Sequence, residues 1–231
     1  MCCVSELSES KEPAATVPRN RVLPPNADAI RNQGRCELTE ERVLQVLARV
    51  CGYMRGQREH YLPMGEPLDR EQVAAMRPFF SPTLLAGVKV VQLVGRRITE
   101  PAFCQEARAL GFEGLPELSH MASLTFEDVL VFNEKITERL LFHALVPAVQ
   151  FQVLGMDRYV ELYVRALLET RWRFSVPLEA HIFELTSKFM ANRKKPFFVE
   201  DEVRMRVSQH RYELFQLPHA TLKPSGADGI L

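Results

Sequence analysis

The stretch that most constrains the fold is residues 137–155, TERLLFHALVPAVQFQVLG. Thr137 is a suitable N-cap and Gly155 a suitable C-terminal stop, so the sequence predicts a helix from Thr137 to Leu154. Apolar side chains cover most of its circumference: Leu140, Leu141, Phe142, Leu145, Val146, Val149, Phe151 and Leu154. A helix of this kind is buried nearly all round.

Two residues of this predicted helix are unusual for a core helix. His143 needs a hydrogen-bond partner or a metal ion, because an unpaired polar group in a core costs about 1 to 3 kcal/mol. Pro147 has no amide proton for the carbonyl group of residue 143, and its ring clashes with that carbonyl at a cost of about 3 kcal/mol. We therefore expect a bend in the turn that holds His143.

Capping residues and apolar spacing predict helices on both sides of this segment. Thr39 suits the N-cap of a helix that continues through Met54, and Asp69 with Gln72 resembles a capping box. The other signals are prolines at first turns and residues that suit caps. The predicted helices span 40–54, 70–76, 101–110 with Gly111 as C-cap, 157–170 with Asp157 as N-cap, 177–190 opened by Pro177, and a stretch within 199–215.

β-Branched residues predict a small sheet in the middle of the sequence. LLAGVKVVQLV, residues 84–94, is typical of a short strand, and MASLTFEDVLVFN, residues 121–133, of two strands or one bulged strand. We expect an antiparallel sheet packed against helices from both sides of it. The predicted fold class is α+β: a mostly helical domain with a small β-sheet packed on the His143 helix.

Composition excludes several classes of function. The 29 basic and 29 acidic side chains cancel, so no net field favours nucleic acid or an anionic membrane surface. No window approaches the roughly 18 uninterrupted apolar residues of a membrane span, and the N-terminus lacks a basic region followed by an apolar one. We expect a cytoplasmic protein with neither nucleic acid nor membrane as a partner.

Composition also suggests how the chain is divided. Residues 1–35 are rich in Ser, Pro, Asn and charge and predict a disordered N-terminal arm, whereas 36–217 can form a single domain and 218–231 a flexible tail. Five cysteines without a CxxC or paired metal spacing indicate reduced thiols. These are Cys2, Cys3, Cys36, Cys51 and Cys104.

Three segments in order carry a resemblance to a known family. LLFHALVPAVQFQVLG is followed by RYVELYVRALLE and then by VPLEAHIFEL, and SLTFEDVLVFNEKIT precedes them. Together they resemble bacterial zincin-like metallopeptidase domains, in which HExxH precedes a glutamine-containing apolar run and then a Pro-Leu-Glu helix. The likeness covers roughly residues 80–190. It implies a zincin-like domain in which a small sheet packs on the active-site helix.

The resemblance implies roles for four positions. In HExxH the two histidines, one helical turn apart, reach one zinc ion, and the glutamate is the general base on the metal-bound water. His143 matches the first ligand and Glu179 resembles a third ligand from a later helix. Ala144 stands at the general base and Pro147 at the second ligand, and neither side chain has an atom for that role. The motif is degenerate, HALVP.

Nearby polar residues do not obviously complete a metal site. His181 lies two positions after Glu179, and on a helix this turns it about 200° away. Glu184 is one to two turns further on, and nothing in the sequence positions His120. Gln150 and His181 are expected instead as binding residues of the ancestral cleft.

We therefore expect a catalytically inactive zincin-like homologue, a pseudoenzyme without a cofactor, whose role is binding an unknown protein or peptide partner or is structural. One alternative is a metal-dependent hydrolase or peptidase with rearranged ligands, which would hold zinc. Another is an unrelated, mostly helical interaction protein whose His143 is satisfied inside the core. A further possibility is a peptide- or partner-binding surface in which Tyr159, Tyr163, Ala166 and Trp172 form an exposed stripe, although core packing explains the stripe more simply.

Overall fold

The apolar helix around His143 is α6, Glu138–Leu154, in a computed structural model of the chain. The Thr137 hydroxyl accepts a hydrogen bond from the Leu140 amide at 3.2 Å, and Gly155 ends the helix with a φ of 76°, which a residue without Cβ adopts readily. Contacts with other helices and with the sheet surround α6, as its all-round apolar character predicts. Pro147 lies inside α6 without ending it.

The structure describes residues 39–109, 115, 117–170 and 175–213. The predicted arm of residues 1–35, the predicted tail of residues 218–231 and Gly111 lie outside the described residues, as do Cys2, Cys3, Cys36 and Trp172. Cys51 and Cys104 are buried free thiols. Burial raises the pKa of both, and that of Cys104 to about 11.

The sheet has four short strands in the order β1-β2-β4-β3: β1, Glu66–Pro67; β2, Lys89–Gln92; β4, Val129–Phe132; β3, Ser123–Phe126. The two strands predicted within 121–133 are β3 and β4, which form a hairpin around Glu127 and Asp128. The antiparallel prediction is wrong for one pair, because β2 and β4 are parallel. A long connection between β2 and β3 permits this crossover, which a tight turn would not.

The strand predicted over residues 84–94 is also too long. Pro82–Gly87 form the short helix α4, and only Lys89–Gln92 are extended. The Ser81 hydroxyl accepts a hydrogen bond from the Leu84 amide at 3.2 Å, and Pro82 occupies the first turn. This N-terminal capping outweighs the β-branched character that begins at Val88.

The other helices follow the capping signals closely. Thr39 caps α2, and Asp69 forms the predicted capping box with Gln72. Asp157 lies in the first turn of its helix and is not the N-cap, because the helix begins at Met156 directly after Gly155. The helices are α2, Glu40–Tyr61; α3, Arg70–Met76; α5, Ala102–Ala109; α7, Met156–Thr170; α8, Pro177–Ala191; and α9, Val199–Ser208, with 3-10 turns η1, Leu62–Met64, and η2, Leu118–His120.

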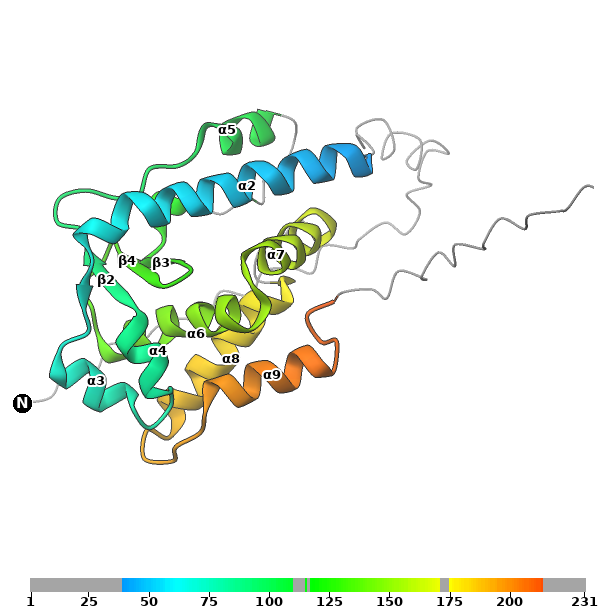
Figure 1. Ribbon diagram of the computed structural model, residues 1–231. Coiled ribbons are helices and arrows are strands. Elements are labelled where there is room, and N and C mark those ends of the chain that lie inside the picture. The colour runs from blue at the N-terminus through cyan, green and yellow to red at the C-terminus, as the bar shows by residue number, and fades with distance from the viewer. Residues whose placement is uncertain (1–38, 110–114, 116, 171–174, 214–231) are drawn as a thin grey trace, which may run out of the picture. The chain divides into compact units, whose positions relative to one another are not determined.

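The two faces of the sheet belong to two hydrophobic clusters, as strand alternation requires. Leu130 and Phe132 join the larger cluster with α6, whereas Val129 and Val131 join a smaller one with side chains of α2. Figure 1 shows α2 along one side of the strands and α6 along the other. The result is the α+β architecture expected from the sequence.

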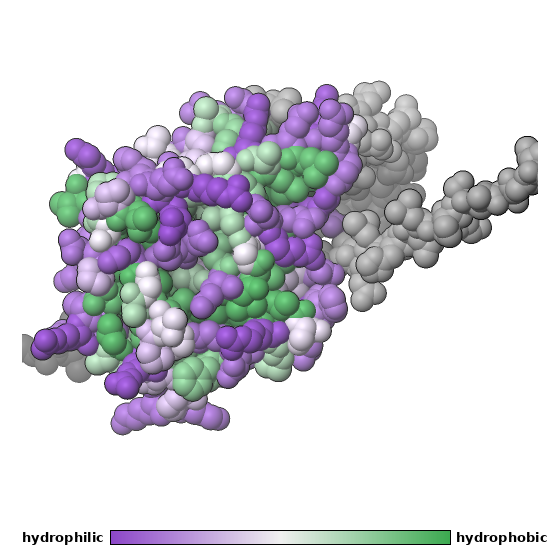
Figure 2. All heavy atoms as spheres, in the orientation of Figure 1, coloured by the Kyte–Doolittle hydropathy of each residue, from purple (hydrophilic) through white to green (hydrophobic). Residues whose placement is uncertain are grey.

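The surface mixes apolar and polar residues. Figure 2 shows hydrophobic residues among hydrophilic ones on the face of Figure 1, with a large apolar area between α2 and α9. Among the described helices, none alone has the length and apolar character to cross a membrane. Together α6 and α7 have that length and apolar character, but the two helices are bent by 114° where they meet.

Candidate functional site

The four positions singled out by the degenerate motif line a single cavity. His143, Ala144 and Pro147 reach it from α6, and Glu179 reaches it from the first turn of α8. The cavity has a volume of about 190 Å³. Its remaining described walls come from α2, α5, β3, α7 and the segment around η2. The helices thus bring together residues that are more than 30 positions apart in the sequence.

Strand β3 is fixed to α6 at the motif itself. The Thr125 hydroxyl donates a hydrogen bond of 2.7 Å to the carbonyl oxygen of Ala144, and both groups are buried. Thr125 and Ser123 lie on alternate positions of β3, which is the edge strand next to the cavity. This hydrogen bond holds the edge of the sheet against the turn of α6 that contains His143 and Ala144.

His143 has a defined hydrogen-bond partner in the interior. Its Nδ1 lies 3.1 Å from the Thr186 hydroxyl oxygen, and the same hydroxyl donates to the Ile182 carbonyl at 2.7 Å. A hydroxyl has one proton, so Nδ1 must be the donor in the first bond. This assigns the histidine a protonated Nδ1 from the surrounding network. The Phe183 ring lies 5.2 Å from the imidazole, centroid to centroid.

Glu179 is a buried carboxylate held by a phenol. It is only 6% exposed, and the Tyr163 hydroxyl donates to its Oε1 at 3.0 Å. It also lies in the first turn of α8, at the positive end of the helix dipole. Tyr163 comes from α7, so three consecutive helices meet at the polar end of the cavity.

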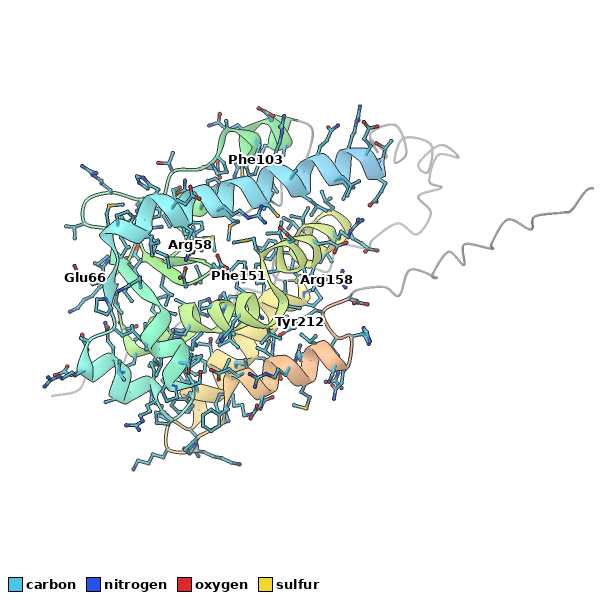
Figure 3. The ribbon with its side chains drawn as sticks, viewed as in Figure 1. Arg58, Glu66, Phe103, Phe151, Arg158 and Tyr212 are labelled. Atoms are coloured by element: carbon cyan, nitrogen blue, oxygen red, sulfur yellow. The ribbon has the colours of Figure 1, made fainter. Side chains whose placement is uncertain are left out.

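Gln150 and His181, the other two predicted binding residues, do not line the cavity. Gln150 is fully buried and donates from Nε2 to the Leu178 carbonyl at 3.2 Å. His181 is 1% exposed, and its Nδ1 lies 2.6 Å from the hydroxyl of Tyr212, which Figure 3 places beside α8. Both residues fix α8 against its neighbours.

The pKa values of this His–Tyr pair follow from burial. Desolvation, with Arg206 and Lys188 nearby, lowers the pKa of His181 to about 3, and desolvation raises the pKa of Tyr212 to about 12. Both groups are therefore neutral near pH 7. Glu179 and His181 take different directions from α8, as their two-residue spacing predicts.

Metal binding needs donors that the cavity does not gather. Among the described residues, no group of three or more His, Cys, Asp or Glu side chains is placed to hold a metal ion. His120 is largely exposed and pairs with Glu117 at 2.6 Å, while Glu184 is exposed and pairs with Arg206. A catalytic zinc ion normally has three protein ligands and a water molecule. His143 and Glu179 supply two.

Sequence reasoning missed three residues of this site: Thr125, Tyr163 as the partner of Glu179, and Thr186. Thr186 follows Glu179 by seven positions, a spacing that places both on one helix face, so a helical projection could have found it. Thr125 and Tyr163 have no such signal, because their contacts depend on how β3 and α7 pack.

Comparison with known proteins adds no relative: no protein-family model, no curated protein and no solved structure matches this chain. The zincin resemblance therefore stays a prediction carried by the motif residues.

Proposed function

We propose that this chain is a catalytically inactive zincin-like homologue whose ancestral metal site persists as a binding cavity. The observation that supports this is the convergence of His143, Ala144, Pro147 and Glu179 on one cavity. Those are the four positions to which the resemblance assigns catalytic roles. His143, Ala144 and Pro147 are close together by their spacing on α6, so the independent support is that Glu179 of α8 lines the same cavity.

Loss of catalysis follows from side-chain chemistry. Ala144 has no proton acceptor to activate water, and Pro147 has no side-chain donor for a metal. The two polar groups that are left have internal partners: the His143 ring bonds to Thr186, and Glu179 accepts from Tyr163. These bonds stabilise the site without a metal ion, and binding a protein or peptide partner is the role that such a site can keep.

Restoring the missing groups tests the proposal. In the double variant Ala144→Glu/Pro147→His, two histidines one turn apart and Glu179 would face the cavity, and we expect zinc binding near one ion per chain by isothermal titration calorimetry. Affinity should be clearly higher than in the unchanged chain, since one imidazole ligand is added and the site then has three protein ligands.

A matched variant separates ligand addition from helix repair. Ala144→Glu/Pro147→Ala also removes the proline but adds no imidazole, and we expect it to bind zinc no better than the unchanged chain. Glu179→Gln in the double-variant background should weaken the zinc affinity again. A folded double variant without a gain in zinc affinity would contradict the zincin ancestry and favour the unrelated helical protein.

A further inference from the structure

The cavity beside His143 is large enough for a small ring system. Apolar protein cavities of about 150 Å³ bind benzene, and this one measures about 190 Å³. On that scale a ligand of about eight or nine non-hydrogen atoms fits. A folded peptide, a nucleotide or a lipid chain is too large for full burial.

The walls of the cavity favour an aromatic ligand. Tyr53 and Phe103 meet edge to face at 5.9 Å, and Tyr53 and Phe126 do so at 6.2 Å, with all three rings lining the cavity. Figure 3 labels Phe103 between α5 and α2. Ring faces and edges in this arrangement attract a further ring, because aromatic pairs prefer offset or edge-to-face contact.

The polar end of the cavity selects a neutral hydroxyl group. Glu179 and His143 line the cavity together with a few hydroxyl side chains, among mostly apolar residues. A carboxylate ligand would meet the Glu179 carboxylate, and its own charge would be costly to bury there without a partner. A hydroxyl both donates and accepts, so it can pair with a carboxylate or with an imidazole in either tautomer.

We infer that this cavity binds a neutral monocyclic aromatic alcohol or phenol, with its ring among Tyr53, Phe103 and Phe126 and its hydroxyl toward His143 and Glu179. This rests on the persistence of the cavity proposed above, and it goes beyond the protein or peptide partner named there by adding a small-molecule ligand. The cavity does not need zinc to hold such a ligand. Binding by the unchanged chain and zinc capture by the double variant therefore succeed or fail separately.

The first test is titration calorimetry of the unchanged full chain with three probes of matched size: benzyl alcohol, cyclohexylmethanol and benzoate. We expect saturable one-site binding of benzyl alcohol, with dissociation constants at least about threefold higher for cyclohexylmethanol and about tenfold higher for benzoate. Absence of saturable benzyl alcohol binding would overturn the inference, and so would equal or tighter binding of benzoate.

Two matched substitutions on α6 place the ligand. Ala144→Leu extends a side chain into the cavity, whereas Ala148→Leu, one turn later, extends into a different hollow beside α4. We expect the first to raise the dissociation constant of benzyl alcohol at least about tenfold and the second to leave it within about twofold.

A second cavity-filling variant provides an independent test in case Ala144→Leu does not fold. Ser123→Phe fills the same cavity from the edge strand β3, where the residue is half-buried. We expect the same tenfold loss of benzyl alcohol affinity. Folded filling variants that bind benzyl alcohol as tightly as the unchanged chain would overturn the assignment of the ligand to this cavity.

Discussion

At the scale of single residues, the bond between His143 and Thr186 explains how a histidine can stay inside α6 without a metal ion. The Thr186 hydroxyl accepts a hydrogen bond from the imidazole and donates one to the Ile182 carbonyl. One buried hydroxyl thus satisfies one side-chain group and one backbone group. Removing that hydroxyl leaves a half-buried N–H of His143 and a buried carbonyl of Ile182 with one partner fewer. The free energy of unfolding should report this loss.

Thr186→Val keeps the shape of the side chain and removes its hydroxyl. We expect the free energy of unfolding to fall by about 1 to 3 kcal/mol, measured by urea denaturation. Thr186→Ser is the matched control, since it keeps the hydroxyl and loses only a methyl group. Its free energy of unfolding should therefore fall by less than that of Thr186→Val. Equal stability of the Val variant and the unchanged chain would show that His143 does not depend on this bond.

At the scale of elements, the β3–β4 turn has a conformation that its sequence does not favour. Glu127 has a φ of 62°, in the left-handed region that side chains with a Cβ rarely adopt. The next residue compensates: Asp128 accepts two hydrogen bonds from Arg58 of α2, at 2.6 and 2.8 Å. Arg58 is labelled in Figure 3 between α2 and this hairpin.

Asparagine tolerates the left-handed region better than other residues with a Cβ, so Glu127→Asn should relieve the turn. We expect it to be more stable than Glu127→Ala by about 0.5 to 1 kcal/mol in urea denaturation. Both variants lose the same carboxylate, which lies 3.3 Å from Arg58, so that ion pair cancels in the comparison. An alanine variant as stable as the asparagine variant would mean that the turn is not strained.

The elements also show what the sequence could and could not predict. The starts of α6 and α3 were predicted because their caps are local hydrogen bonds between residues three positions apart. The parallel pairing of β2 with β4 was not, because it depends on where the chain returns after α5. In the site, His143 and Glu179 follow from a motif, whereas Thr125 and Tyr163 depend on tertiary packing.

At the scale of the whole molecule, the buried pair of His181 and Tyr212 joins the end of the described chain to α8. Burial lowers the pKa of His181 from its ordinary 6.5 to about 3 in the folded protein. Between these values the unfolded chain binds a proton that the folded chain does not. The contribution of neutral His181 to the free energy of unfolding is therefore complete above pH 6.5, and it is lost as the pH falls toward 3.

We expect the free energy of unfolding to decrease by roughly 1 kcal/mol per pH unit between about pH 6.5 and pH 5, where most carboxylates stay ionised. Urea denaturation at several pH values measures this slope. His181→Gln keeps a hydrogen-bonding side chain next to Tyr212 and cannot titrate, so its slope should be smaller by that amount. Identical slopes in the two proteins would exclude His181 as the titrating group.

The most direct test of the central claim is the zinc content per chain, by inductively coupled plasma mass spectrometry after dialysis against zinc. The unchanged chain and Ala144→Glu/Pro147→His are measured side by side. We predict zinc well below one ion per chain in the first and close to one in the second. Near-stoichiometric zinc in the unchanged chain would contradict the claim, because it would mean that His143 and Glu179 already belong to a complete metal site.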